Sequence, residues 1–419
     1  MSVKVSDQEA LEYHQFPKPG KVAMEITKSV ANQRDLSLAY TPGVAVPCLE
    51  IKKDPNDAYK YTAKGNLVAV ISNGTAVLGL GNLGALASKP VMEGKGVLFK
   101  KFAALDSYDI EVDTENIDRF CSVVTAIAPT FGGINLEDIK APECFEIERR
   151  LVEELNIPVM HDDQHGTAVI SSAGIINACQ ITNRKIEKIK VVIVGAGAAA
   201  ISCGRLYREL GVKQIYMYDS KGLIHNGRSD LNDFKREFST HHYMTHAEVF
   251  EGADVVVGLS GPGSFSVDDI KLMAEEPIIF TLANPTPEIM PDIVRECRPD
   301  AIIATGRSDF DNQVNNVLGF PFIFRGAMDV RAKKINMQMK LAASHALAEL
   351  TRKEVPAYLR EIYGKEIVFG KEYIIPKPFD KRLIVEISSA VALAAIESGV
   401  AKGEGFDIER YKVELAAKL

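Results

Sequence analysis

Two pairs of neighbouring acidic residues are the part of this chain best suited to chemistry. Asp162 and Asp163 follow a short apolar run, and Glu137 and Asp138 follow a glycine-containing turn 25 residues upstream. Adjacent carboxylates at the end of a buried strand repel each other and lose hydration, so they usually persist where a cation or a basic partner offsets the cost. Oxygen ligands without a nearby cysteine suit Mg²⁺ or Mn²⁺ better than Zn²⁺. The sequence therefore predicts a site for a hard divalent cation.

Simpler roles compete with this interpretation. Any one of these acids, taken alone, is more often a helix cap than a metal ligand. His161 and His165 flank the second pair and raise the alternative of zinc, but helix capping or packing beside the carboxylates explains both histidines more simply. The metal hypothesis rests on the two acidic pairs together.

A glycine pattern between a strand and a helix predicts a dinucleotide site. The apolar run 190–194 leads into Gly195-Ala196-Gly197-Ala198-Ala199-Ala200, and a helix is expected from 198 to 210. Gly195 permits the tight turn, Gly197 lets the backbone approach a pyrophosphate, and Ala200 is small enough for close packing of helix on strand. The alternative is a glycine turn in an α/β protein without a nucleotide, but the strand and helix on either side favour binding.

Asp219 ends the next predicted strand, at 214–218, where it can face the adenosine ribose. A carboxylate there accepts hydrogen bonds from the ribose hydroxyls and repels a 2′-phosphate, which favours NAD over NADP. Lys221 argues the other way, because its ammonium could reach such a phosphate. We expect NAD or NADP, with the carboxylate favouring NAD.

The bulk composition is that of an ordinary enzyme of two domains. The chain has 419 residues, of which 46% are hydrophobic and 25% charged, and this length exceeds what one compact core usually holds. Its 56 acidic residues against 49 basic ones give a net charge of −7, which disfavours nucleic acid as a partner. We find no apolar run that spans a bilayer and no secretion signal, and the scattered cysteines are typical of reduced thiols. A cytoplasmic enzyme is expected. The cysteines are Cys48, Cys121, Cys144, Cys179, Cys203 and Cys297.

The pattern of elements changes near residue 165. Before it, short helices and strands mix: we expect a strand at 66–71, a helix at 142–155, and at 85–98 a helix that Pro90 shortens or interrupts. After it, strands alternate with helices, which predicts a doubly wound parallel sheet of the Rossmann type. The prediction is an α/β protein with a smaller mixed domain at 1–165 and a dinucleotide domain at 166–419 that ends in long helices. The later strands are expected at 190–194, 214–218, 253–259, 277–282 and 301–305.

Several separated motifs together resemble the malic enzyme family, specifically its short bacterial form, over most of the chain. The resemblance implies oxidative decarboxylation of L-malate to pyruvate and CO₂, with reduction of NAD(P)⁺, a divalent cation, decarboxylation of oxaloacetate, and a homodimer contacted through the amino-terminal arm. The motifs are SLAYTPGVA at 37–45, NGTAVLGLGN at 73–82, PVMEGK at 90–95, LED at 136–138, HDDQHGT at 161–167, ANPTPE at 283–288 and NNVLGFP at 315–321.

By the same resemblance, each matching residue has an expected role. Lys95 matches the general base and Tyr40 the general acid, with Asp162 beside the lysine. The residues that match the metal ligands are Glu137, Asp138 and Asp163, and those that match contacts to substrate or nicotinamide are Asn284, Asn315 and Asn316. A lysine acts as a base near neutral pH only when its surroundings lower its pKa, whereas a tyrosine keeps its proton for the last step.

In larger family members an arginine in the glycine turn contacts the substrate carboxylate, and here Ala76 stands at that place. Thr75 or a neighbouring subunit is expected to contribute instead.

Other functions remain open. A malolactic-type enzyme would convert malate to lactate and retain NAD, and a silent protein could bind NAD or malate without turnover. A Rossmann-type amino-acid dehydrogenase would not need the paired carboxylates. Release of reduced coenzyme and sensitivity to a chelator separate these alternatives.

Overall fold

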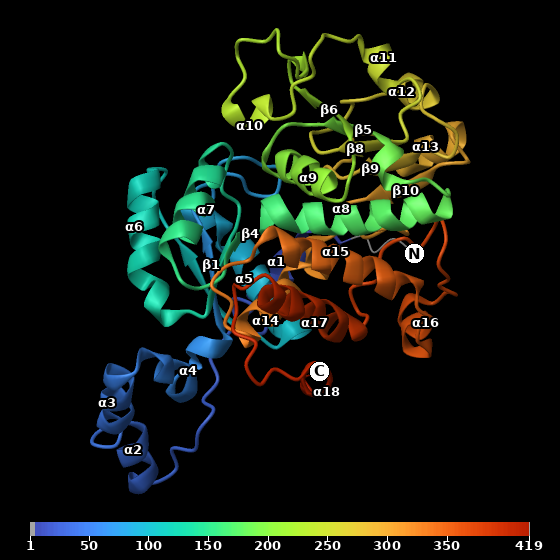
Figure 1. The fold of residues 1–419 in the computed structure, drawn as a ribbon. Coiled ribbons are helices and arrows are strands. Elements are labelled where there is room, and N and C mark those ends of the chain that lie inside the picture. The colour runs from blue at the N-terminus through green and yellow to red at the C-terminus, as the bar shows by residue number, and fades with distance from the viewer. Residues whose placement is uncertain (1–4, 419) are drawn as a thin grey trace.

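The computed structural model describes residues 5–418 and is built on two sheets (Figure 1). The first sheet has four parallel strands and the second has six, five of them parallel. The predicted α/β class is therefore confirmed, including its Rossmann-type sheet. The strands of the first sheet are β1 (Leu67–Ser72), β2 (Asp106–Glu111), β3 (Gly133–Leu136) and β4 (Val159–His161).

The first sheet has the order β2-β1-β3-β4, so β3 and β4 are neighbours. Because both strands run in the same direction, their carboxyl ends meet at one edge of the sheet. The acidic pairs follow directly after these two ends, which brings them together. The helices that accompany this sheet are α5 (Ala85–Ala103), α6 (Ile117–Ile127) and α7 (Glu143–Glu154).

The second sheet has the order β10-β9-β8-β5-β6-β7. The chain moves outward from β5 to β6 and then returns to β8 on the other side, so the strand order reverses beside β5, where a doubly wound sheet binds its ligand. All five long strands overlap the predicted ranges. The strands are β5 (Lys190–Val194), β6 (Gln214–Asp219), β7 (Gly222–Leu223), β8 (Val255–Gly258), β9 (Ile278–Thr281) and β10 (Ile302–Thr305), and the helices between them are α9 (Ala198–Glu209), α10 (Asp233–Arg236), α11 (His246–Phe250), α12 (Val267–Lys271) and α13 (Pro291–Cys297).

The helix α8 (Asp162–Ile181) lies between the two sheets (Figure 1). It starts where β4 ends and packs along α9 and α15, and one continuous apolar core includes residues of both sheets. The expected boundary near residue 165 falls inside this helix, so α8 belongs to both halves. The remaining helices are α14 (Phe320–Asp329), α15 (Met337–Arg352), α16 (Ala357–Tyr363), α17 (Arg382–Glu397) and α18 (Ile408–Ala416).

One predicted element is wrong: Pro90 does not interrupt the helix over 85–98. The helix α5 runs through Pro90 for 19 residues. The bond that proline removes belongs to the carbonyl of Leu86, whose side chain is 84% exposed, so the gap lies on the solvent side. Met92 and Phe99, two and nine residues beyond Pro90, are fully buried and hold the helix against the sheet. Packing of the apolar stripe outweighs the local cost of the proline.

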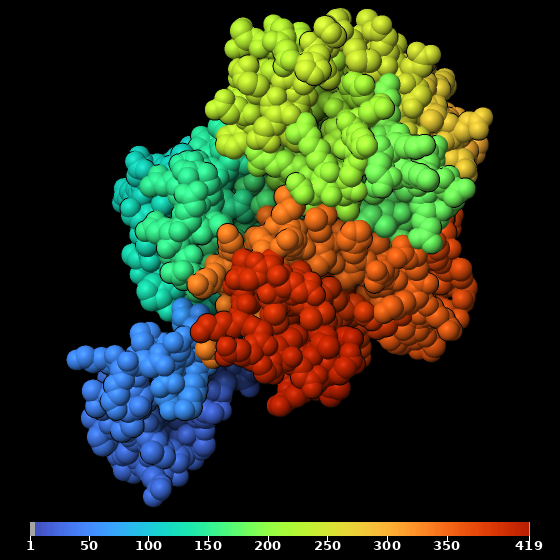
Figure 2. All heavy atoms as spheres, in the orientation of Figure 1, coloured from blue at the N-terminus to red at the C-terminus, as the bar shows by residue number. Residues whose placement is uncertain are grey.

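The amino-terminal segment forms a lobe that stands off the body (Figure 2). Its helices bury no residue, and its attachment includes Lys21, whose Nζ donates to the carbonyl of Pro90 at 2.7 Å. Three large apolar side chains of this amino-terminal region, Met24, Ile26 and Leu38, are 84%, 80% and 64% exposed. The lobe contains α2 (Gln33–Ala39), α3 (Ala45–Lys53) and α4 (Ala58–Tyr61), whereas α1 (Asp7–Gln15) lies outside it, within the outline of the main body (Figure 1).

Within residues 5–418, we find no helix with the length and apolar character that a membrane crossing requires.

Candidate active site

Three carboxylates from two adjacent chain segments meet at the carboxyl edge of the first sheet. Glu137 and Asp138 follow β3, and Asp163 lies in the first turn of α8. One oxygen of each lies within 4.8 Å of the others. The backbone N–H of Asp138 donates to Oδ2 of Asp163 at 2.7 Å, which ties the two segments together. The spacing is that of ligands around one small cation.

The electrostatics of this cluster favour a cation as a binding partner. Glu137 and Asp138 are each 3% exposed. Burial raises the pKa of Asp138 to about 8, with a further contribution from the Asp163 carboxylate. Burial also raises the pKa of Glu137 well above its usual range. Oδ2 of Asp138 has no hydrogen-bond partner among the described residues. Buried, oxygen-only and partly unpartnered ligands suit Mg²⁺ or Mn²⁺.

Lys95, on α5, is the positively charged side chain that contacts this cluster of carboxylates. Its Nζ lies 2.5 Å from Asp162 and 2.9 Å from Glu137, and 4.2 Å from the ring centre of Phe320. Burial lowers the pKa of Lys95, but the attraction of Asp162, Glu137 and Asp163 is stronger and raises the pKa above its usual range. Lys95 therefore does not have the lowered pKa that a general base needs as long as the neighbouring carboxylates are charged.

Asp162 is placed beside Lys95 as expected, and Asn316 lies against it. A Cβ added to Gly166 would lie 2.3 Å from Oδ1 of Asp162 and 2.9 Å from Nδ2 of Asn316, so only glycine leaves room for both. The hydroxyl of Thr167 donates to Oδ1 of Asn316 at 3.1 Å. The motif residues 166 and 167 thus position the amide that faces the carboxylate.

The remaining predicted substrate contacts divide into two groups. Thr75 is 4% exposed, and its hydroxyl already donates to Asn73 at 2.7 Å and accepts from the Lys140 N–H at 3.0 Å. Asn315 is likewise engaged, because its side-chain oxygen accepts from the Val317 N–H at 3.0 Å. These hydrogen bonds hold the loops that carry the two side chains in place.

Asn284 lies where the two halves of the chain approach each other. Its carbonyl oxygen is 2.7 Å from the position of a Cβ on Gly79, in the loop that follows β1. Its amide nitrogen is 2.6 Å from the corresponding position on Gly306, which follows β10. A loop of the second sheet therefore reaches the glycine turn of the first, with glycine required at both contacts.

The glycine pattern forms one wall of a pocket of about 770 Å³, which we call the coenzyme pocket. Gly195 has φ +133°, and a Cβ there would lie 2.4 Å from the carbonyl oxygen of Leu259. Ala200 is 1% exposed against the sheet. Gly197 has open space at the position of a Cβ, as an approaching pyrophosphate requires. The lining includes Gly195, Ala196, Gly197, Asp219, Ser220, Lys235 and Ser260, and Ala198 begins α9 beside it.

The structure removes the basis of the expected NAD preference. Both oxygens of Asp219 are occupied: Arg228 donates to them at 2.8 and 2.9 Å, and Lys235 donates at 2.7 Å. Burial raises the pKa of Asp219, but the bonds from Arg228 and Lys235 outweigh it and lower the pKa to about 2. A carboxylate paired with two cations repels a phosphate far less than a free one. Sequence reasoning missed both cations because Arg228, in irregular chain, and Lys235, on the short helix α10, lie 9 and 16 residues further on.

Tyr40 is the one predicted catalytic residue that the structure does not bring to the cluster. It follows α2, in the lobe, and is 70% exposed. In Figure 1 the lobe with α2 and α3 lies at one end of the molecule, beyond the first sheet. Asn135, by contrast, was not predicted: its side chain donates to Oε2 of Glu137 at 2.9 Å, and only its position two residues before an acidic pair could have suggested it.

Sequence comparison identifies the two halves. The profile of the malic enzyme N-terminal domain matches residues 19–152, and that of the malic enzyme NAD-binding domain matches residues 164–363. The chain belongs to the malic enzyme family. An NADP-dependent malic enzyme of Halomonas elongata is 59% identical over 94% of both chains. The malic enzyme structure from Pyrococcus horikoshii has a TM-score of 0.87 at 41% identity, covering 98% of this chain and 95% of that one.

Two further relatives carry names that mention a different coenzyme or a second activity. An NAD-dependent malic enzyme of Rhizobium meliloti is 55% identical over 97% of this chain, which spans 53% of that relative's length. A bifunctional malic/malolactic enzyme of Bacillus subtilis is 49% identical over 94% of both chains. The family is therefore an NAD(P)-dependent oxidoreductase family in which coenzyme and product differ between members.

The raised pKa of Asp138 predicts how stability depends on pH without a cation. Between the ordinary value of 3.8 and about 8, the folded chain keeps a proton that the unfolded chain releases, so stability falls as pH rises through this window. At pH ~8 with a chelator, Asp138→Asn is expected to raise Tm by at least about 3 °C, and Mn²⁺ should stabilise only the wild type.

Calorimetry across this range measures the effect, with Asp268→Asn as the control because that side chain is 93% exposed. If Tm depends on pH equally in the wild type and in Asp138→Asn, Asp138 is not the group whose pKa is raised by folding.

Proposed function

We propose that this protein catalyses the divalent-cation-dependent oxidative decarboxylation of L-malate to pyruvate and CO₂ with reduction of NADP⁺, and that it also decarboxylates oxaloacetate. The observation that carries the proposal is the cluster of three buried carboxylates in contact with Lys95, in a family whose members are named as malic enzymes. The six cysteines are all free thiols, which supports a place in the reducing cytoplasm.

A divalent cation held by Glu137, Asp138 and Asp163 would supply Lewis acidity toward the malate hydroxyl and toward the oxygen that becomes negative when CO₂ leaves. The chain's own contribution is to hold and move protons. Lys95 accepts the hydroxyl proton as hydride passes to the nicotinamide, and Asn316 and Asn284 orient the bound acid beside the coenzyme.

Lys95 must lose its own proton before it can act as a base. The carboxylates of Glu137 and Asp162 hold that proton at 2.9 and 2.5 Å. Any positive charge that neutralises the cluster weakens this attraction and lowers the lysine pKa, while burial continues to favour the neutral amine. The same charge that binds the substrate therefore prepares the base.

The final proton goes to the methylene carbon of enolpyruvate, and we assign it to Tyr40 of a second copy of the chain. Within one chain Tyr40 is 70% exposed on the lobe, beside exposed apolar side chains such as Leu36 and Leu49. A homodimer that exchanges these lobes would bury this surface and place each Tyr40 at the partner's carboxylate cluster.

The coenzyme assignment rests on Lys235 and Arg228. Together with Ser220, which lines the same pocket, they surround the place where Asp219 would meet the ribose. Arg228 also pairs with Asp230, which pairs with Lys221 in turn, so two carboxylates against three cations leave a net positive charge that suits the 2′-phosphate of NADP⁺.

The activity assay follows reduced coenzyme at its absorbance maximum with malate and Mn²⁺. Lys95→Ala is expected to lower kcat by about 10²–10⁴-fold because the general base is lost. Lys101→Ala, on the exposed side of the same helix, should match the wild type. Excess chelator should abolish turnover. A Rossmann-type amino-acid dehydrogenase, which needs no cation, would remain active under the same conditions. Retention of rate within a few-fold in Lys95→Ala would contradict the base assignment.

Lactate in place of reduced coenzyme in the same assay would favour the malolactic alternative, which the name of the Bacillus relative keeps open.

Mixed dimers test the exchange of lobes. Tyr40→Phe and Lys95→Ala homodimers should each be inactive, but a dimer with one chain of each type keeps one site with both residues and should recover about half the wild-type activity. Two affinity tags allow the mixed dimer to be isolated. A mixed dimer as inactive as its parents would place Tyr40 within its own chain's site or outside the reaction.

Coenzyme choice is tested at Lys235. Lys235→Ala should lower kcat/KM for NADP⁺ by at least about tenfold, since a charge-assisted hydrogen bond contributes on the order of 1.5–3 kcal/mol, and should leave NAD⁺ unchanged or improved. Lys213→Ala, just before the opposite end of β6, is the matched control. Equal losses for both coenzymes would contradict a phosphate contact.

A further inference from the structure

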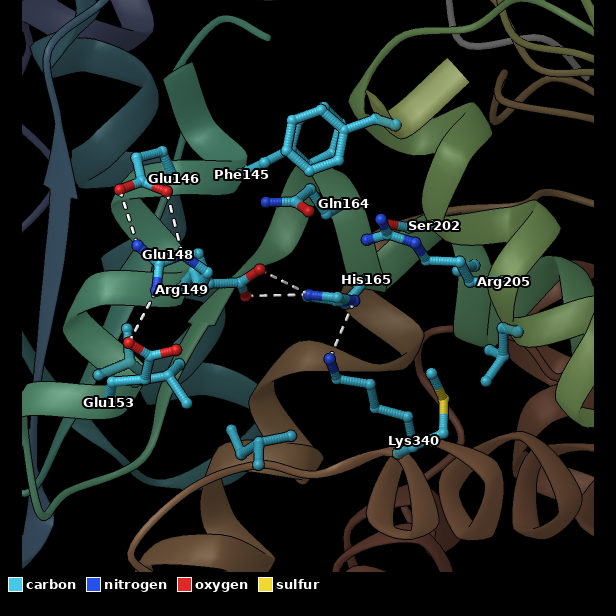
Figure 3. A pocket seen from close by; sticks show the side chains of 17 residues that line it. Phe145, Glu146, Glu148, Arg149, Glu153, Gln164, His165, Ser202, Arg205 and Lys340 are labelled. Atoms are coloured by element: carbon cyan, nitrogen blue, oxygen red, sulfur yellow. Dashed lines mark hydrogen bonds and ion pairs between the residues drawn. The ribbon is translucent and has the colours of Figure 1, made fainter. Parts of the chain in front are cut away.

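Another cavity, distinct from the coenzyme pocket, lies between the two halves of the chain beside the first turn of α8 (Figure 3). Its volume is about 490 Å³, and α7 of the first half and α9 of the second both line it. This size and a position between domains are typical of small-molecule sites. Neither the cluster nor the coenzyme pocket shares a lining residue with it.

Two buried polar side chains of the lining have no partner among residues 5–418. Gln164, on α8, is 1% exposed, and Ser202, on α9, is 3% exposed. Nε2 of Gln164 and Oγ of Ser202 make no hydrogen bond with the described residues. A buried amide or hydroxyl without a partner is costly, so such groups usually serve a ligand or water.

A cationic side chain stands at the same cavity. Nζ of Lys340 donates to Nδ1 of His165 at 3.0 Å, and the opposite ring nitrogen lies 2.9 Å from Glu148 (Figure 3). Since Nδ1 accepts from the ammonium, the imidazole carries its proton on Nε2 and is neutral. In the described chain, no carboxylate lies within 4.0 Å of Lys340. Burial lowers the pKa of Lys340 to about 8, as expected for an ammonium that lacks a close counter-ion.

The other walls limit what this cation can bind. Phe145 and Phe234 pack with ring centres 4.3 Å apart, and Leu206 and Met337 add aliphatic surface. The charges of the lining balance, with the acids Glu146, Glu148 and Glu153 against Arg149, Arg205 and Lys340. A multiply charged phosphate or tricarboxylate has no surplus of positive charge to hold it, whereas a single carboxylate can pair with Lys340 alone.

We propose that this cavity is a binding site for a small amphipathic monocarboxylate, whose carboxylate pairs with Lys340, Gln164 and Ser202 while its apolar body packs against Phe145 and Phe234. The site is separate from that of malate. Its lining includes none of the carboxylates Glu137, Asp138 and Asp163, nor Lys95. A ligand here bridges α7 and α9, and the proposal stands whether or not the proposed reaction is correct.

The test is calorimetric titration of the full-length protein with 3-phenylpropionate and with its neutral amide. The wild type should bind the acid saturably and the amide at least about tenfold more weakly, because the amide lacks the charge. Lys340→Met should weaken binding of the acid by at least about tenfold, and Gln164→Met by about 2–10-fold. Lys334→Met, an exposed lysine just outside the cavity, is the matched control.

Ala168→Met tests the location, because Ala168 lines the cavity at 2% exposure and a longer side chain would fill it. Binding of the acid should then be lost while thermal unfolding remains cooperative. The proposal is overturned if neither probe binds the wild type, if the amide binds as tightly as the acid, or if Lys340→Met and Ala168→Met both leave the affinity unchanged.

Discussion

The burial of several carboxylates at one sheet edge is the constraint on which the rest of this structure depends. Glu137, Asp138 and Asp162 are nearly inaccessible, and Asp163 adjoins them. In the described chain, Lys95 is the only lysine or arginine that makes an ion pair with these acids. One ammonium cannot neutralise four acids, and this imbalance is what a divalent cation would correct. Parallel strands β3 and β4 impose the arrangement, since both acidic segments leave the sheet at the same edge.

The helix α8 transmits this arrangement to the rest of the molecule. Its first turn carries Asp162 and Asp163, its glycine at 166 admits Asn316, and its length packs along α9 of the coenzyme half. Gln164 and His165, in the same part of the helix, line the cavity that contains Lys340. A shift of α8 would therefore move the acids, the amide and the cavity together. The largest apolar cluster includes residues of both sheets, and a separate cluster contains the alternate residues of the second sheet.

Local sequence patterns predicted the fold class, the long strands and the convergence of the acidic pairs, because strand periodicity and glycine turns are local signals. Three features depended on contacts between distant residues and were not predictable. The cations at Asp219 come from an irregular segment and from the short helix α10, the helix through Pro90 depends on burial of its apolar face, and the position of Tyr40 depends on where the lobe lies. The hydroxyl of Thr75 is likewise consumed by neighbours that spacing does not reveal.

Anomalous diffraction from crystals grown with Mn²⁺ tests the central claim most directly. The account predicts a single strong peak among the carboxylates of Glu137, Asp138 and Asp163, with ligand distances of about 2.0–2.3 Å, and none in crystals of Asp138→Asn. A peak elsewhere, or three side chains turned away from one another around an empty space, would contradict it.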